Sequence, residues 1–169
     1  PNIFGAFSML MVNIRGFAST PASPFTGIKI MLKNMKWLIK AKKESHLEIP
    51  LYLKDLIAHV SSNAAGCRYC QAHTAYTAHR NGVAIEKLQK VWEFQTSDLF
   101  SAKEKAALSF AYAAGSVPNQ VTKEHHDTLN EHFTEKQIIE IMSTIAIFGF
   151  LNRWNDSMIT PLEDEPFEF

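Results

Sequence analysis

The sequence predicts an all-α fold in a single domain. Apolar residues repeat at intervals of three and four along most of the chain, and the apolar–polar alternation typical of strands is absent. A length of 169 residues suits one domain, or one domain with an arm. No internal repeat or linker divides the sequence. We therefore expect about six to seven helices, separated by turn signals.

Three segments are expected along the chain. Residues 1–24 form an apolar N-terminal arm that ends in a Pro- and Ser-rich stretch. Residues 25–162 form the helical domain, and residues 163–169 form an acidic tail. The domain holds every motif to which we assign chemistry below.

The first helices of the domain follow from periodicity and from their end signals. One is expected over residues 27–43, where apolar side chains share a face. Pro50 begins a second helix, because proline is favoured in the first turn, and Gly66 ends it. A third is expected over about residues 67–80, since the pair Asn81-Gly82 then stops the helix.

Capping signals place the later helices. A fourth helix is expected over about residues 84–94, and a short one begins at Thr122. Capping boxes predict the starts of two others: Ser101 with Glu104, and Thr134 with Gln137. The last helix runs to about residue 158 and is apolar on more than one face. A second subunit could cover it, so we expect a homo-oligomer, a trimer or a multiple of dimers or trimers.

Charge and composition argue against several classes of partner. Lys and Arg total 17 and balance 17 Asp and Glu, whereas nucleic-acid binders usually carry a basic excess. The longest apolar runs fall short of the roughly 18 residues that span a bilayer. The apolar stretch at residues 3–14 lacks the basic region and cleavage site of a signal peptide. We expect a cytoplasmic protein with no nucleic-acid or membrane partner.

The informative segment holds the two cysteines of the chain, Cys67 and Cys70. They close too small a loop to stabilise a fold, so they are a redox pair, half of a metal site or a coincidence. On one helix they occupy neighbouring turns, close enough for a disulfide. Cys67 follows Gly66 at the helix start, where free N–H groups stabilise a thiolate. His73 is three residues after Cys70 and can accept its proton, which favours Cys70 as the attacking thiol.

Two residues of the preceding helix extend this cluster. Asp55 and His59 share one helix face, and Asp55 comes twelve residues before Cys67. The break at Gly66 lets the two helices fold together, so we expect carboxylate, imidazoles and thiols in one pocket that relays protons. His59 is a possible member of this relay. The alternatives are a packed His59 and an Asp55 that is simply solvated.

These residues resemble a known family. An acid twelve residues before the first cysteine, then Gly-Cys-x-Tyr-Cys and His, is similar to the alkylhydroperoxidase D-like branch of the carboxymuconolactone decarboxylase family. The stretches Trp92 to Phe100 and Phe150-Leu-Asn-Arg-Trp-Asn-Asp156 are also similar, so residues 25–162 match in layout. The resemblance implies an all-α homo-oligomer that reduces hydroperoxides through a dithiol–disulfide cycle, with an unknown dithiol reductant and no cofactor.

The resemblance also implies roles for single residues. Cys70 would be the peroxidatic thiol, Cys67 the resolving thiol, His73 the base and Asp55 the acidic member of the relay. The sequence departs from the family pattern at two points. The family acid is usually Glu, and the founding alkylhydroperoxidases place their His at the position of Thr74.

Other interpretations of the same residues stay open. Zinc could use both cysteines and His73 with His59 or His79, but structural zinc sites usually draw a second ligand pair from a distant knuckle, so we expect no metal. A lactone-processing decarboxylase of the same fold would rely on acid–base chemistry and would not need a cysteine pair. A non-enzymatic redox sensor could use the same disulfide. Arg153 and Asp156, three residues apart, most simply form an ion pair.

Overall fold

The computed structural model describes residues 48–162, and these residues confirm the all-α prediction. Within them lie the helices α4 (Leu51–Ala64), α5 (Arg68–Arg80), α6 (Ile85–Gln89), α7 (Ala102–Gly115), α8 (Lys123–His132) and α9 (Glu135–Ser157), together with the short 3₁₀ helix η2 (Val91–Glu93). No strand occurs in this part of the chain. The predicted arm, the helix at residues 27–43 and the acidic tail lie outside the described residues.

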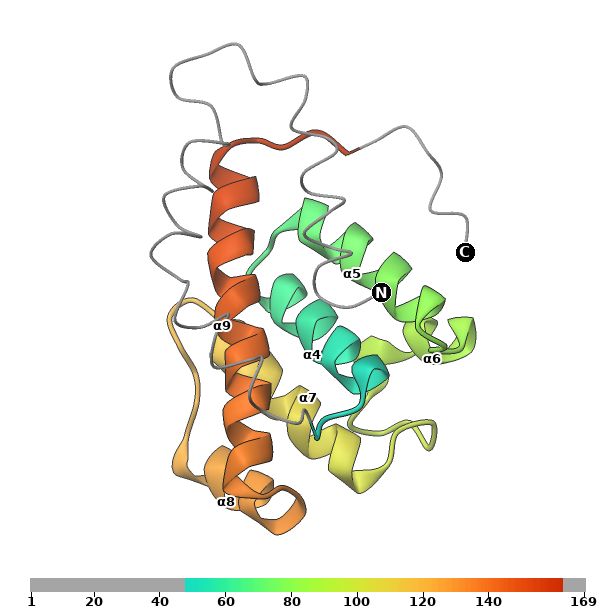
Figure 1. Ribbon diagram of the computed structural model, residues 1–169, viewed down its shortest axis with the longest axis vertical. Helices are drawn as coiled ribbons and strands as arrows, with labels where there is room; N and C mark the ends of the chain where they lie inside the picture. The colour runs from blue at the N-terminus through green and yellow to red at the C-terminus, as the bar shows by residue number, and fades with distance from the viewer. Residues whose placement is uncertain (1–47, 163–169) are drawn as a thin grey trace. The chain divides into compact units, whose positions relative to one another are not determined.

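Helix α4 is the centre of the described unit, in contact with α5, α7 and α9 (Figure 1). Its side chains Leu56, Ile57 and Val60 are fully buried. Each such side chain contributes about 1.5–3 kcal/mol when it is removed from water. The end of α7 packs closely on α4, since a Cβ at Gly115 would come within 2.6 Å of the Ser61 carbonyl oxygen. This packing fixes the position of the helix that precedes the thiols.

Local signals place the helix ends where the sequence predicts them. Pro50 is the N-cap of α4, and Gly66 has a φ of +80°, which a residue with a side chain rarely adopts. The helices α7 and α9 begin with the predicted capping boxes at Ser101 and Thr134. These ends are set by hydrogen bonds between near neighbours, which explains why short sequence patterns predict them.

The region between α5 and α7 differs from its prediction. One helix was expected over residues 84–94, whereas the structure has α6, a break at Lys90 and then η2. The break turns Val91 and Phe94 into the core, where they are 0% and 8% exposed. It leaves the ring of Trp92 at the surface, 49% exposed. Tertiary packing thus overrides a local helical pattern here.

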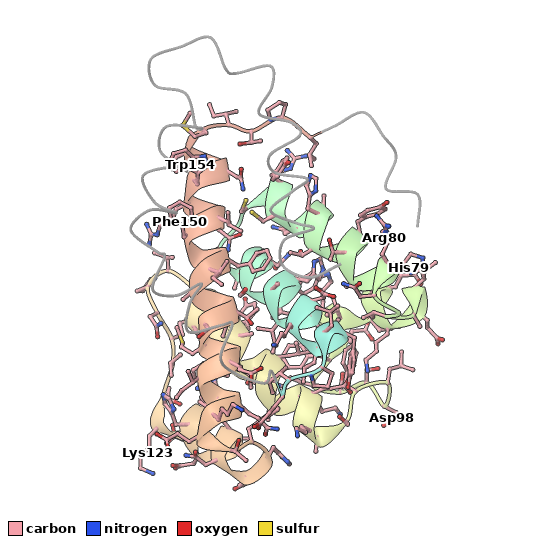
Figure 2. The ribbon with its side chains drawn as sticks, viewed as in Figure 1. His79, Arg80, Asp98, Lys123, Phe150 and Trp154 are labelled. Carbon is pink, nitrogen blue, oxygen red and sulfur yellow. The ribbon has the colours of Figure 1, made fainter. Side chains whose placement is uncertain are left out.

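Helix α9 is anchored to the start of α4 by a charged contact. Glu140 accepts a hydrogen bond from Lys54 at 2.9 Å, and both side chains are about nine-tenths buried. The same carboxylate accepts the backbone N–H groups of Glu48 and Ile49. Figure 2 shows Phe150 and Trp154 on the side of α9 that faces away from α4 and α5. No helix among the described residues has the length and apolar character needed to cross a bilayer.

Candidate active site

The two thiols lie together at the start of α5. Cys67 is the N-cap of this helix, and its sulfur accepts the backbone N–H of Cys70 at 3.3 Å. Both are free thiols, 1% and 4% exposed. The left-handed turn at Gly66 directs the chain from α4 into α5, so that the first sulfur meets the free N–H groups of a helix terminus. The predicted juxtaposition of the cysteines is therefore confirmed.

The two thiols have opposite shifts in pKa. A hydrogen bond from the Cys70 thiol lowers the pKa of Cys67 to about 7, against the effect of burial. That same bond, burial and the charge on Cys67 raise the pKa of Cys70 far above its ordinary value. Near neutral pH Cys67 is therefore partly ionised, while Cys70 keeps its proton. This order is the reverse of the one that the sequence argument favoured, because the neighbouring thiol, rather than a base, decides it.

The C-terminal end of α9 completes the surroundings of the thiols. Asn155, 3% exposed, donates its side-chain N–H to the Cys70 sulfur at 3.4 Å. The carboxylate of Asp156 raises the pKa of both thiols through its charge. From the sequence, the segment Phe150 to Asp156 is a family-like stretch with an expected ion pair between Arg153 and Asp156, and nothing in it indicates a role for Asn155. The contact depends on how α9 packs on α5, which no local pattern encodes.

His59 is buried beside α5, one turn beyond the thiols. Its Nδ1 lies 3.0 Å from the Thr74 hydroxyl and 3.1 Å from the Gln71 carbonyl oxygen. Burial lowers its pKa to about 4, so the ring is neutral at physiological pH. The Thr74 hydroxyl in turn donates to the Cys70 carbonyl oxygen at 2.6 Å. His59 thus holds the first turns of α5 in place, and its role as a proton carrier stays a prediction.

Helices α4 and α5 form a helical hairpin, and Asp55 lies at the end of it that is far from the thiols. The expectation that Asp55 shares a pocket with the thiols is wrong. It accepts a hydrogen bond from Asn81 at 2.6 Å, at the C-cap of α5. Asn81 comes eleven residues after Cys70, about 16 Å further along the helix axis. The two helices run antiparallel, so residue 55 faces the end of α5 rather than its start. Burial raises the pKa of Asp55 to about 6.

His73 occupies the helix turn that follows Cys70. Its ring stacks on the ring of Tyr69, with the centroids 4.2 Å apart. Its role as a base is still a prediction. In the described part of the chain, no three side chains of the types His, Cys, Asp and Glu are grouped in a way that could hold a metal ion.

A cleft of about 530 Å³ lies on another side of α4. Its walls come from α4, η2, α7 and α8, and they are formed by Asn63, Trp92, Phe94, Gln95, Ser109, Tyr112, Ala113, Gln120 and His125. The Trp92 ring contacts the His59 ring, with the centroids 5.2 Å apart. Asn63 donates to the Gln71 side chain at 3.2 Å. The cleft is thus joined to the thiol-bearing helix through two side-chain contacts, and the sequence did not predict it.

Comparison with known proteins gives a family match over part of the chain. The model of the carboxymuconolactone decarboxylase family matches residues 31–113, which include both cysteines. A solved structure of the debrominase Bmp8, a cysteine-to-alanine variant in complex with 2,3,4-tribromopyrrole, is 37% identical, with a TM-score of 0.72. That match covers 90% of this chain and 76% of the other. The chain belongs to the carboxymuconolactone decarboxylase family. The resemblance inferred from the cysteine motif is therefore confirmed.

Two other solved structures extend the comparison. The debrominase without ligand is 46% identical over 69% of this chain and 62% of its own, with a TM-score of 0.66. A protein of unknown function from Agrobacterium tumefaciens, suggested to be the antioxidant defence protein AhpD, is 18% identical. It shares the fold over 89% of this chain and 99% of its own, with a TM-score of 0.64.

The chain is also similar to a curated protein that is itself uncharacterized. YnjA of Escherichia coli is 28% identical over 97 residues, which are 57% of this chain. The match spans about half of the length of that relative, 53%.

Proposed function

We propose that this protein is a dithiol reductase that takes an electrophilic atom from its substrate on Cys67 and then forms a disulfide with Cys70. The observation that carries the proposal is the pair itself. Cys67 lies at a helix N-terminus and has a pKa lowered to about 7, while Cys70 has a raised pKa and donates a hydrogen bond to the Cys67 sulfur. Such a pair attacks once and resolves once. An external dithiol then returns the disulfide to two thiols.

The substrate class we favour is a brominated aromatic ring. A debrominase is 37% identical over 90% of this chain, and its complex with 2,3,4-tribromopyrrole was obtained with a cysteine replaced by alanine. Both facts support a bromine acceptor among the cysteines of this fold. An electron-rich pyrrole resists attack by a nucleophile at carbon, so a thiolate reacts more readily at bromine.

The reaction balances with two thiols. The Cys67 thiolate takes bromine as its bond to carbon breaks, and the ring carbon then takes a proton from solvent. Cys70 next loses its proton and attacks the Cys67 sulfur, a sulfur–sulfur bond forms, and bromide leaves with the electron pair. The ring is reduced by two electrons, and the dithiol is oxidised by two electrons.

Reduction of a hydroperoxide is the second candidate, and the same pair favours it. The Cys67 thiolate would break the oxygen–oxygen bond, release an alcohol and become a sulfenic acid. Cys70 would then form the disulfide and release water. The lactone-processing alternative has less support, because it leaves the cysteine pair without a role and because Asp55 and His59 are hydrogen-bonded to Asn81 and to the backbone of α5.

A single-turnover experiment separates the two substrates. Reduced protein is mixed without added reductant with a series of brominated pyrroles, including 2,3,4-tribromopyrrole, and separately with hydrogen peroxide and cumene hydroperoxide. We expect one bromide and one debrominated ring per disulfide, with deuterium on the ring carbon in deuterium oxide. Disulfide formed only with the peroxides would select the second candidate. Sustained turnover with dithiothreitol would separate an enzyme from a sensor, and no disulfide with any of them would contradict the proposal.

We also propose that the protein is a homo-oligomer. Ile139, Met142 and Phe150 lie on one side of α9 and are 59%, 42% and 37% exposed. Apolar side chains gathered in this way commonly mark a protein–protein interface. Sedimentation velocity should give a mass that is a multiple of the 19.1 kDa chain. A monomer at micromolar concentration would contradict this.

A further inference from the structure

The side chain of Asn155 is fixed so that its N–H, and not its oxygen, faces a reacting sulfur. The amide nitrogen lies 3.4 Å from the Cys70 sulfur. The Thr160 hydroxyl donates to the amide oxygen at 3.1 Å, which determines which way the amide points. The Thr160 N–H also donates to the Asn155 carbonyl oxygen at 3.0 Å. Residue 155 is thus held through both its side chain and its backbone.

The turn that brings Thr160 back onto Asn155 has an unusual backbone. Ile159 has a φ of +50°, in the left-handed region that β-branched residues rarely adopt. It follows the end of α9, and the bond from the Thr160 N–H to the Asn155 carbonyl closes the turn as in a Schellman motif. Glycine usually fills such a position. Strained residues of this kind cluster at functional sites, because the surrounding contacts must maintain them.

We infer that Asn155 is a catalytic residue of the disulfide-forming step, in which its N–H stabilises the negative charge that develops on the Cys70 sulfur. In the reduced protein Cys67 has the lower pKa, whereas the Asn155 N–H faces the sulfur of Cys70. The inference rests on the dithiol reaction proposed above. It divides the reaction into two steps. The attack by Cys67 does not need Asn155, whereas formation of the disulfide by Cys70, called closure below, does.

The step balances with the groups already named. Once Cys67 carries the transferred atom, the Cys70 thiol loses its proton, and the sulfur–sulfur bond forms as the bond from Cys67 to that atom breaks. After peroxide attack, the proton leaves with the departing hydroxide as water. After debromination, bromide departs and the proton passes to solvent. An N–H donor 3.4 Å from the Cys70 sulfur lowers the energy of this thiolate in either case.

The test compares two buried asparagines of α9. Asn155→Leu removes the N–H with little change in volume. Asn152→Leu is the matched control, because Asn152 lies one turn away, is also 3% exposed, and has no hydrogen-bond partner for its side-chain atoms. Each reduced protein is mixed with hydrogen peroxide, quenched at intervals and analysed by mass spectrometry. The measured species are thiol, sulfenic acid at Cys67 and disulfide.

We expect Asn155→Leu to lose the Cys67 thiol at the wild-type rate, and to accumulate sulfenic acid because closure is about tenfold slower. The pH at which closure becomes half-maximal should also rise. Asn152→Leu should match the wild type. Thr160→Val, which frees the amide to rotate, should slow closure in the same direction but less, and it provides the test if Asn155→Leu does not fold.

Two results would overturn the inference, and they differ. If the wild type forms a disulfide and the folded Asn155→Leu and Thr160→Val variants close it equally fast, Asn155 has no role in closure and the dithiol reaction stands. If the wild-type thiols do not react with peroxide or with a brominated pyrrole, the proposed function itself fails, and the role of Asn155 fails with it.

Discussion

At the Gly66 end of the α4–α5 hairpin, two buried sulfurs face each other, whereas at the Asn81 end the carboxylate of Asp55 faces an amide. Each end contains a titratable group whose pKa is shifted, the buried Cys67 at one end and the half-buried Asp55 at the other. At the Gly66 end a hydrogen bond between the two thiols opposes desolvation and lowers the pKa of Cys67. At the Asn81 end desolvation dominates and raises the pKa of Asp55. The first environment produces a nucleophile, and the second only joins two helices.

The largest difference between the two ends should appear in turnover. Cys67→Ser should abolish reaction with the brominated pyrrole or hydroperoxide, because it removes the attacking sulfur. Cys70→Ser should react once and stop, with Cys67 oxidised and no disulfide. Mass spectrometry of the protein after one addition of substrate distinguishes the two variants. If Cys70→Ser abolished the reaction and Cys67→Ser reacted once, Cys70 would be the attacking thiol.

The neighbouring thiol should set the acidity of Cys67. Cys70→Ala removes the largest influence that lowers the pKa of Cys67, so this pKa should rise from about 7 toward the ordinary thiol range. At neutral pH the thiolate fraction, and with it the rate of alkylation by iodoacetamide, should fall. The rate is measured across pH in wild type and variant. An unchanged profile would mean that the helix terminus alone stabilises the thiolate.

The acid near the thiols should act in the opposite sense. The charge of Asp156 raises the pKa of both thiols, so Asp156→Asn should lower the pKa of Cys67 by less than Cys70→Ala raises it. Alkylation at mildly acidic pH should then be faster than in the wild type. Glu131→Gln, at an exposed carboxylate of α8, is the control and should leave the profile unchanged.

The smallest effect on the reaction is expected at the far end of the hairpin. Asp55→Asn should leave the rate of Cys67 attack within about twofold of the wild type, because its partner Asn81 lies about 20 Å along the helix axis from Cys67. Its effect should be on stability instead. A large loss of thiol reactivity in a folded Asp55→Asn variant would contradict this expectation and would support the proton relay predicted from the sequence.

The effect of Asp55 on stability depends on pH in a defined direction. Its folded-state pKa, about 6, lies above that of the unfolded chain, so the folded state binds more protons between about pH 4 and pH 6. Stability is therefore greatest below that window and falls as pH rises through it. Asp55→Asn should remove this fall. Urea denaturation should then give the variant a larger free energy of unfolding than the wild type at pH 7, and this difference should shrink at pH 4. A difference in the free energy of unfolding that grows toward pH 4 would contradict the conclusion that burial raises the pKa of Asp55.

The sequence predicts a feature well when the residues that form it are close together along the chain. Pro50, Gly66 and the capping boxes act over a few residues, and so does the three-residue spacing of the cysteines. The sequence identified those helix ends and the thiol pair. The twelve-residue spacing of Asp55 and Cys67 fits a shared pocket and an antiparallel hairpin equally well. Packing of the helices decides between them.

The contact between Asn155 and Cys70 could not be predicted from the sequence. These residues are 85 positions apart, so no spacing rule brings them together. The order of the thiol pKa values differs from the sequence-based expectation for a related reason. It depends on which sulfur receives the hydrogen bond of the other, and that is a detail of side-chain geometry at the start of α5.

The central claim is that Cys67 carries the thiolate, and site-resolved alkylation tests it most directly. Reduced protein is treated briefly with iodoacetamide across a range of pH, and mass spectrometry of the peptides measures the label on each cysteine. We predict that Cys67 is labelled first, with a midpoint near pH 7, while Cys70 stays unlabelled until much higher pH. Labelling of Cys70 before Cys67 would contradict the account.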